Sequence, residues 1–370
     1  MQKAFDTVDH KILLHKLGYY GIRGTANEWF RSYLTDRKQY VSINGFESKT
    51  ITMKYGVPQG SVLGPLLFLV YINDLHKSIK YCTTRHFADD TNLLIKNKSL
   101  KQLNKHVNID LRNLCKWLKS NKISLNASKT ELLVFRHPNK ELNYNLKIKI
   151  DGKKLLPSNY VKYLGLYIDS HLKWNYHTDI LAPKLSRAIG MLSKIRHYVN
   201  QNTLRTIYFG IFSSILTYGC QIWGQILNKN VNRIIKLQDK VIRIINFAYY
   251  NASRNPLYNN SKILKLSDNI KLLNFMYVHD SSKGTLPLAL KNNFMFSHNL
   301  HTYNTRGSLL NKVLLPRVRT KVYGLKSINY ESSLVWNNLV SKFGENTLHL
   351  KTKYYCKKLI TQYLLHNYLN

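Results

Sequence analysis

The spacing of apolar residues changes near Trp174, and this change constrains the fold of the 370-residue chain more than any other feature. Before Trp174, short segments with alternating apolar residues lie between longer segments with helical spacing. After it, apolar residues recur at intervals of four and three, which is typical of a helix with one buried face: Leu181, Leu185, Ala188, Leu192, Ile195 and Val199. The chain is therefore predicted to contain an α+β part with a largely antiparallel sheet, followed by an all-helical part.

The elements of the first part can be located from local patterns. Helices are expected within 10–34 (with breaks at glycines), over 63–75 and over 100–121. Residues 39–45 alternate and end in Asn44-Gly45, which is a strong signal for a hairpin. Strands are also expected within the segments 86–96, 132–135, 146–150 and 161–168, the first of them turning at Asp89-Asp90.

The second part is predicted to be helical over 181–199, 234–244, 262–279 and 331–342. Residues 251–261 are rich in Asn and contain Pro256, so they are expected to form a linker. Residues 317–323 alternate basic with other residues and are expected to form a strand. Residues 206–228 carry no charge, but their Ser, Thr, Gln and Gly content favours a buried helix over a membrane span.

The charge of the chain indicates a polyanionic partner. It has 56 Lys and Arg against 19 Asp and Glu, a net charge of +37. Nucleic acid is the first candidate, ahead of an acidic membrane surface. Residues 1–180 hold 14 of the acids and have a net charge of +15, whereas residues 181–370 hold 5 and have a net charge of +22. The acids are therefore concentrated in the α+β part.

Cysteine usage and the N-terminus exclude several classes of protein. The four cysteines lie more than 30 residues apart, which excludes a zinc ribbon or a disulfide scaffold and suggests a reducing compartment: Cys82, Cys115, Cys220 and Cys356. The first residues contain no apolar segment of the kind found in signal peptides. We expect a chain without membrane association.

Two adjacent acids, Asp89 and Asp90, form the first candidate site. About one such pair is expected by chance in a chain of this composition, so the pair alone means little. The surrounding sequence favours a functional role for the pair, because the pair lies between apolar segments, as at the tip of a hairpin. Like charges held there repel each other unless a cation relieves them, which favours a divalent metal. A solvated turn is the equally weighted alternative.

Residues 55–65 (YGVPQGSVLGP) form the second candidate site. Two glycines and two prolines indicate a defined loop, and a helix beginning near Ser61 would direct its amide donors back toward that loop. Such a loop suits an anionic or nucleotide ligand. An ordinary entry into a helix explains the same residues equally well.

Five segments in this order resemble the reverse transcriptases of non-LTR (LINE-type) retrotransposons, the jockey-like group most closely. The segments are 3–14 (KAFDTVDHKILL), 56–61 (GVPQGS) with 64–68 (GPLLF), 87–90 (FADD), 124–130 (SLNASKT) and 163–165 (YLG). The correspondence covers residues 1–170 and continues more weakly beyond them. It implies a right-hand polymerase palm, then a helical thumb and a mostly helical C-terminal region, over 1–170, 171–250 and 251–370.

The resemblance implies an RNA-directed DNA polymerase that uses an RNA template, a DNA primer and deoxynucleoside triphosphates, with Mg²⁺ as cofactor. Asp89 would bind metal and Asp90 would support it in two-metal nucleotidyl transfer. Phe5 matches the aromatic residue that excludes a ribose 2′-hydroxyl, while Gln59 and Gly60 match the nucleotide- and template-contacting position. Lys129 matches the residue proposed to protonate pyrophosphate, although an ordinary surface lysine is the simpler interpretation of its local sequence.

The sequence departs from the family at its start. The first palm motif of the family begins with a metal-binding Asp five residues before the aromatic gate, and counting back from Phe5 puts it immediately before Met1. Asp6 follows the gate and so cannot take the place of that residue. The fingers and any endonuclease segment are also not found in these 370 residues. We therefore expect a truncated chain that binds nucleic acid but is inactive by itself, and we expect the codon before Met1 to encode Asp.

Two basic groups are candidates for contacts with a nucleic-acid backbone. The first has helical spacing beside an apolar stripe: Arg233, Lys236, Lys240 and Arg243. The second alternates along the expected strand and ends near Tyr323: Arg317, Arg319 and Lys321. In both cases a solvated basic face is the alternative.

Two rival functions remain open at this stage. One is a catalytically dead, nucleic-acid-binding remnant of such an element. The other is a group II intron-like reverse transcriptase with maturase function. The resemblance also leaves the compartment open between the nucleus and a cytoplasmic ribonucleoprotein.

Overall fold

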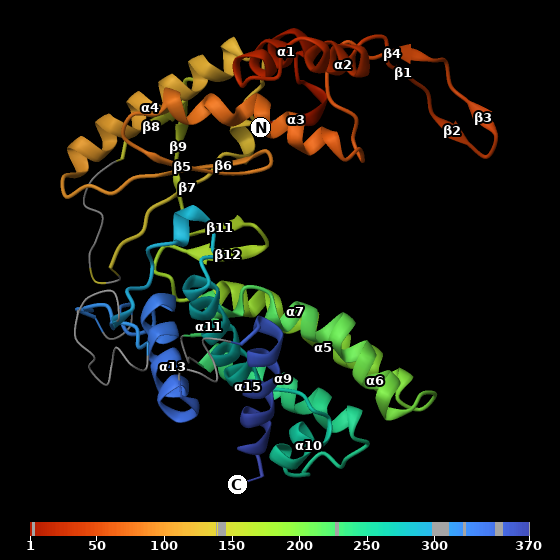
Figure 1. Ribbon diagram of the computed structural model, residues 1–370, viewed down its shortest axis with the longest axis vertical. Coiled ribbons are helices and arrows are strands. Elements are labelled where there is room, and N and C mark those ends of the chain that lie inside the picture. The colour runs from red at the N-terminus through yellow and green to blue at the C-terminus, as the bar shows by residue number, and fades with distance from the viewer. Residues whose placement is uncertain are drawn as a thin grey trace. The chain divides into compact units, whose positions relative to one another are not determined.

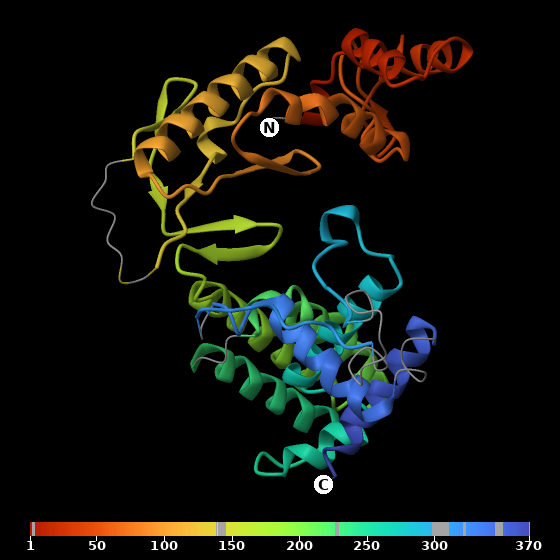
Figure 2. The same ribbon diagram turned by 60° about the vertical axis from the view of Figure 1, so that its left-hand side comes forward.

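The computed structural model describes residues 1, 4–137, 139, 146–225, 229–297, 311–320, 323–344 and 351–369. The chain divides into two compact units, Met1–Val161 and Lys162–Asn370 (Figures 1 and 2). The first unit mixes helices with short strands, and the second is mostly helical. This confirms the predicted mixture of helix and sheet, and the change of character falls near the position that the apolar spacing indicated.

The first unit contains four α-helices and three short 3-10 helices among its described residues. They are η1 (Ala4–Asp6), α1 (His10–Tyr19), α2 (Thr25–Leu34), α3 (Leu63–Ile72), η2 (Asn73–Ser78), α4 (Leu100–Ser120) and η3 (Ala127–Lys129). Asp9 caps α1, because its carboxylate accepts a hydrogen bond from the Ile12 amide at 3.0 Å. The predicted helices over 10–34, 63–75 and 100–121 are confirmed, with the last turn of the second tightened to a 3-10 helix.

The strands of this unit pair two at a time. Antiparallel pairs are β1 (Lys38–Gln39) with β4 (Ile51–Thr52), β2 (Ser42–Ile43) with β3 (Phe46–Glu47), β5 (Thr83–Phe87) with β6 (Asp90–Leu94), and β8 (Ile148–Ile150) with β9 (Lys153–Leu155). The pair of β7 (Leu132–Leu133) and β10 (Pro157–Ser158) is parallel. The hairpin predicted at Asn44-Gly45 is confirmed, and both residues have the positive φ that a tight turn requires.

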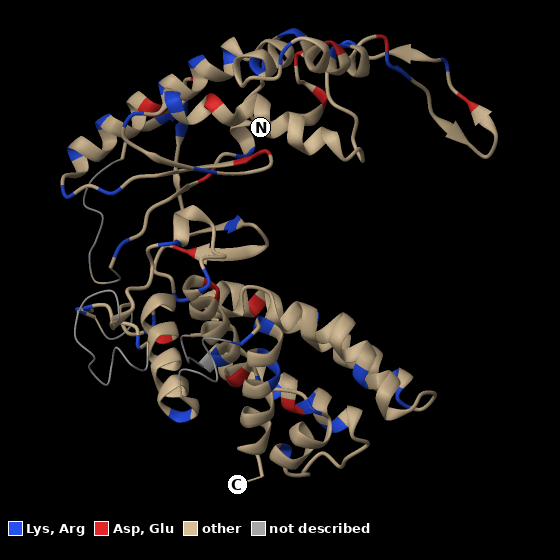
Figure 3. Ribbon diagram, viewed as in Figure 1, with Lys and Arg blue, Asp and Glu red and all other residues tan. Residues whose placement is uncertain are grey.

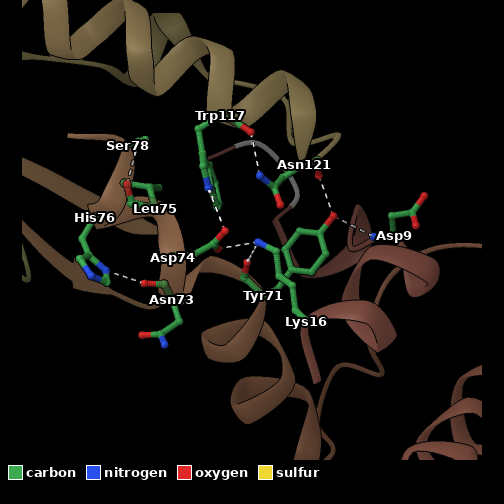
Figure 4. A network of polar contacts seen from close by, with 10 residues as sticks. All are labelled: Asp9, Lys16, Tyr71, Asn73, Asp74, Leu75, His76, Ser78, Trp117 and Asn121. Atoms are coloured by element: carbon green, nitrogen blue, oxygen red, sulfur yellow. Dashed lines mark hydrogen bonds and ion pairs between the residues drawn. The ribbon is translucent and has the colours of Figure 1, made fainter. Parts of the chain in front are cut away.

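Helices α1, α3 and α4 share one apolar core, which includes Leu13, Phe68 and Leu118. A polar network fixes the same elements beside it (Figure 4). Lys16 Nζ lies 2.6 Å from both Asp74 Oδ1 and the Tyr71 carbonyl oxygen. Burial lowers the pKa of Lys16, while its hydrogen bond to Asp74 opposes this shift. The network therefore stabilises the helices to which the acidic hairpin and the glycine loop are connected.

Strands β11 (Tyr160–Tyr163) and β12 (Leu166–Asp169) pair at the boundary between the units. The strand structure predicted for 161–168 is confirmed, except that a turn at 164–165 divides it into two strands. Leu164 and Gly165 have φ values of 45° and 82°, so the chain turns there. The Leu164 carbonyl accepts a 2.6 Å hydrogen bond from the Tyr218 hydroxyl, and this contact with a distant residue fixes the turn.

The helices of the second unit build two apolar cores, one around α5 and α9 and one around α11 and α13. The described helices are α5 (Asn175–Ile195), α6 (Gln201–Ile207), η4 (Tyr208–Ser213, a π-helix), α7 (Ser214–Thr217), α8 (Cys220–Trp223), α9 (Lys229–Ile245), α10 (Arg254–Asn260), α11 (Leu266–Ser282), η5 (Leu288–Leu290), α13 (Ile328–Phe343) and α15 (Lys353–His366). The predicted buried face of α5 is confirmed. None of the described helices is long and apolar enough to cross a membrane.

Two local predictions in this unit are wrong. Residues 251–261 are not a linker, because they contain α10, whose Tyr258 is fully buried and donates to Asp239 at 3.0 Å. Residues 317–320 form no strand. Pro316 lacks an amide donor, and Thr320 instead accepts two hydrogen bonds from the Gly324 amide. Lys321, with Val322, lies outside the described residues.

Candidate functional site

The acidic pair lies at the tip of the hairpin formed by β5 and β6. Phe87 pairs with Asp90, and Ala88 has a φ of 49° in the turn between them. Asp89 is half-buried and Asp90 is exposed. Neither carboxylate forms a hydrogen bond or ion pair with any described residue. The predicted hairpin is confirmed, and its two negative charges are not neutralised by the part of the protein that the structure describes.

The start of the chain lies against this hairpin. The amino group of Met1 donates to the Asp89 carbonyl oxygen at 3.3 Å. A few residues later, the Phe5 ring packs on Phe68 of α3, with the ring centroids 4.6 Å apart. Phe5 is half-buried. The residue just before the first motif therefore contacts the third motif, although 88 positions separate Met1 from Asp89, and the first motif itself packs on the second.

The glycine loop is joined to the first motif by backbone hydrogen bonds. The Gly56 amide donates to the Val8 carbonyl at 2.8 Å, and the Val57 amide donates to the Phe5 carbonyl at 2.8 Å. Gly56 has a φ of 90°, and a Cβ atom there would lie 3.0 Å from the Asp6 backbone. The approach is so close that only glycine fits without displacement of the backbone.

Gln59 and Gly60 lie on the exposed side of this junction. The Gln59 side-chain amide donates to the Asp6 carboxylate at 2.7 Å. Gly60 has a φ of 79°, and a Cβ atom there would meet nothing within 4 Å. The loop therefore needs glycine at position 60 for its conformation and leaves open space in front of it, as a bound ligand would require.

Helix α3 begins at Leu63, as the predicted range 63–75 has it and close to the start expected near Ser61. Ser61 Oγ donates to the Pro58 carbonyl at 2.7 Å and accepts from the Gly64 amide at 3.0 Å. A Cβ atom at Gly64 would lie 2.6 Å from the Pro58 oxygen. One amide of the helix start is thus used to close the loop, and that donor is not available to a ligand.

Two residues of the first motif that build this site were not predicted as site residues. Asp6 is excluded as a catalytic carboxylate by its position after Phe5, yet it anchors Gln59. His10 belongs to no predicted site, and its Nε2 atom lies 2.7 Å from the Gly56 carbonyl oxygen. Both contacts join segments about 50 residues apart, so no local pattern could have indicated them.

Lys129 lies apart from these contacts. It ends η3, where the Asn126 side chain accepts a hydrogen bond from its amide at 3.2 Å, and its own side chain is exposed. No contact links that side chain to the other candidate residues within the described part of the chain. Its role stays a prediction.

The basic residues of α9 differ in exposure. Arg233, Lys236 and Lys240 are exposed, and Arg233 lies 4.0 Å from Asp179. Arg243 is half-buried and donates to the Ala252 carbonyl at 3.2 Å. Arg317 and Arg319 are exposed but lie on irregular backbone. The two groups remain candidates for nucleic-acid contacts, with Arg243 serving the fold as well.

The donors at the hairpin tip suit a hard cation. Asp89 and Asp90 offer carboxylate oxygens, which Mg²⁺ binds together with water and substrate phosphates. No group of three or more His, Cys, Asp or Glu side chains that could hold a metal occurs among the described residues. The pair therefore fits Mg²⁺ as part of a shared site rather than as a closed cage of protein ligands.

Known proteins share sequence similarity with this chain. Residues 1–168 match the family described as reverse transcriptase (RNA-dependent DNA polymerase). The chain is 29% identical to a probable RNA-directed DNA polymerase from transposon BS of Drosophila melanogaster, over 73% of this chain and 31% of the relative. It is 26% identical to the RNA-directed DNA polymerase from mobile element jockey and 28% identical to a probable RNA-directed DNA polymerase from transposon X-element, both of Drosophila melanogaster. These two alignments each cover 76% of this chain, and the chain spans about a third of the length of these relatives.

Proposed function

We propose that this chain, whose residues 1–168 belong to the reverse transcriptase family, carries the polymerase chemistry of a jockey-like non-LTR retrotransposon. The reaction is RNA-directed DNA synthesis. An RNA template, a DNA primer and deoxynucleoside triphosphates are its substrates. The relatives whose names state this activity support the proposal.

One observation carries the proposal. The N-terminal segment contacts both the hairpin tip with Asp89 and Asp90 and the glycine loop, although the three come from different parts of the sequence. Two carboxylates that no described residue neutralises, linked through this segment to an open, conformationally fixed loop, suit a phosphate substrate with its cation. Two adjacent like charges at one tip repel each other, and a bound cation would relieve that repulsion.

In this assignment, Asp89 and Asp90 would hold Mg²⁺, which when bound activates the primer hydroxyl and neutralises charge on the triphosphate. Phe5 restricts the sugar of the incoming nucleotide. Gln59, oriented by Asp6, and Gly60 contact the nucleotide or the template strand. Lys129 is the candidate proton donor to pyrophosphate. The first unit then acts as a palm and the following helices as a thumb and C-terminal region, within the bounds predicted from the sequence.

The test places a carboxylate where the resemblance expects one. A version of the chain with Asp directly before Met1 is compared with a version carrying Asn there, using primed RNA, Mg²⁺ and deoxynucleotides. Because the Met1 amino group contacts the Asp89 backbone, the added side chain lies close to the acidic hairpin. We expect extension from the Asp version and about 100-fold less from the Asn version or the 370-residue chain, because less charge is neutralised in the transition state.

Extension that is equal with Asp, with Asn and without either would contradict this assignment. RNA binding without extension by any version would leave nucleic-acid binding as the function.

A further inference from the structure

Exposed tyrosines gather at one end of the second unit, outside the segment that matches the reverse transcriptase family. Tyr198, Tyr249 and Tyr250 are 87%, 85% and 89% exposed. Among the Phe, Tyr and Trp residues that the structure describes, Phe46 is the only other one above 80%. Exposure of three such rings together is costly in water unless a partner covers them.

Hydrogen bonds bring the two turns that carry these rings to the same end of the unit. Tyr198 lies between α5 and α6, and the other two tyrosines lie between α9 and α10. Asn246, which follows α9, accepts from the Gln201 side chain of α6 and from Asn260 of α10, both at 2.9 Å. The same elements can be followed in Figure 1.

The turn after α9 is held in a fixed conformation. The Ala248 amide donates to the Arg243 carbonyl at 3.0 Å, and Arg243 Nε donates to the Ala252 carbonyl at 3.2 Å. Phe247 has a φ of 53° at the position where helices usually end in glycine. A left-handed conformation is unfavourable for a bulky residue, so the fold tolerates strain to keep this turn. The two tyrosines are therefore presented on a rigid support.

The surroundings of the rings are positively charged. Residues 194–206 and 243–265 contain seven basic residues and no acid: Lys194, Arg196, Arg205, Arg243, Arg254, Lys262 and Lys265. Figure 3 shows basic positions on α6, α9 and α10. Arg254 pairs with Asp239, whereas Lys194 and Lys262 are exposed and form no salt bridge with the described residues. The potential at this end is positive, and it favours an anionic partner.

The composition of the exposed surface distinguishes a nucleic acid from a membrane. No Leu, Ile, Val or Met residue described in these two segments is among the exposed large apolar side chains. Membrane-bound surfaces usually insert aliphatic side chains together with aromatic ones, whereas bases of a single strand stack on aromatic rings beside cations. The exposed rings are the feature that a single strand uses.

We propose that this tyrosine face, defined as Tyr198, Tyr249 and Tyr250 with the seven basic residues around them, binds single-stranded RNA. Unpaired bases stack on the rings, and the cations contact the phosphates. The choice of RNA over single-stranded DNA rests on the proposed function, which brings the chain to an RNA template. The face lies outside the nucleotide site, so it retains RNA independently of the polymerase chemistry.

The test measures binding of a labelled 20-nucleotide single-stranded RNA without secondary structure to the whole chain. The variant with Tyr198, Tyr249 and Tyr250 all changed to Ala is expected to bind about 100-fold more weakly, because three stacking platforms are removed. The corresponding Phe variant keeps the rings and stays within about threefold of the parent. Tyr354→Ala, which removes a 76% exposed tyrosine elsewhere, is the matched control and leaves binding unchanged.

Salt dependence and other ligands separate the possible outcomes. The Ala variant keeps the salt slope of the parent, because stacking releases no counterions. If the Ala variant binds the RNA with an affinity within about threefold of the parent, the proposal is overturned. Loss of affinity for single-stranded DNA or for acidic phosphatidylserine vesicles, with RNA binding intact, would overturn it as well. If RNA binding falls as expected while no version extends a primer, the tyrosine face stands and the proposed polymerase function fails.

Discussion

The two halves of the chain use their acidic residues differently. In residues 181–370, every Asp or Glu that the structure describes lies in an ion pair: Asp239, Asp268, Asp280 and Glu331. In the first unit, Asp9 pairs with Lys122 and Asp110 accepts hydrogen bonds from backbone amides. Asp89 and Asp90 form no such interaction with the described residues, and the same is true of the exposed acids Asp36, Glu47 and Glu131. Among the described residues, only the hairpin tip holds two adjacent acids of this kind, whereas the helical unit presents mainly positive charge.

The strongest test of this comparison replaces one carboxylate that has hydrogen-bond partners and one that has none. Asp110 is fully buried and accepts from the amides of Lys80, Tyr81 and Cys82 at 2.9, 2.8 and 2.7 Å. Asp110→Asn is expected to lower the free energy of unfolding by about 3 kcal/mol, because buried amides lose their acceptor. Asp89→Asn is expected to change it by less than about 0.5 kcal/mol. Urea unfolding of both variants measures the difference, and equal losses would refute the distinction.

The glycine loop offers a second comparison within the first unit. Gly56→Ala places a Cβ atom 3.0 Å from the Asp6 backbone at a φ of 90°, and about 2 kcal/mol of stability should be lost. Gly60→Ala is the matched control, since its φ of 79° is also positive but nothing lies within 4 Å of the new atom. About 1 kcal/mol is expected there from backbone strain alone. Thermal or urea unfolding distinguishes them, and a larger loss at Gly60 than at Gly56 would show that the close approach is not real.

Titration with acid sharpens the contrast between the carboxylates. Burial alone would raise the pKa of Asp110, but its hydrogen bonds from three backbone amides hold that pKa below its ordinary value. Its contribution to stability is therefore fully present above the unfolded-state pKa, about 3.9, and is lost as the pH falls through the lower folded-state value. The stability difference between the parent and Asp110→Asn should shrink by about 1 kcal/mol between pH 5 and pH 3. A difference that grows on acidification would contradict this account.

Several of these features could be predicted from the sequence because they depend on local spacing. The buried face of α5, the turn at Asn44-Gly45 and the hairpin around Asp89 are of this kind. Helix α10 was missed because its Asn and Pro content is typical of a loop. The burial of Tyr258 and its hydrogen bond to Asp239 stabilise the helix instead. The paired strands at 160–169 were merged because Tyr218, far along the chain, fixes the turn between them.

The candidate site could likewise be predicted only where it depends on local sequence. The order of the motifs indicated Asp89, Gln59 and the glycine loop, because their spacing is a property of the sequence. The contacts of Gln59 with Asp6 and of His10 with Gly56 join distant segments, and only the folded chain reveals them. The tyrosine face likewise depends on exposure and on contacts through Asn246, which no local pattern contains.

The smallest expected effect concerns the basic face of α9. Lys236→Ala combined with Lys240→Ala should flatten the slope of log affinity against log salt for single-stranded RNA by about 1.4, or 0.7 for each phosphate that the lysines no longer neutralise. Lys357→Ala with Lys358→Ala removes the same charge from exposed positions of α15 and should leave the slope unchanged. Binding titrations at several salt concentrations give both slopes. Identical slopes in the two double variants would show that the α9 lysines belong to an ordinary solvated surface and do not contact the RNA.

The central claim is that the hairpin carboxylate at Asp89 is reserved for chemistry and not for folding or RNA binding. Its most direct test is primer extension on RNA by the version carrying Asp before Met1, with Asp89→Asn compared to Asp151→Asn. Asp151 also lies in a hairpin turn, with a φ of 45° of its own, and its carboxylate lies 3.8 Å from Lys119 Nζ in an exposed ion pair. We expect Asp89→Asn to lose at least about 1000-fold in extension rate while RNA affinity stays within about twofold, and Asp151→Asn to retain both. Equal extension by the two variants would contradict the account.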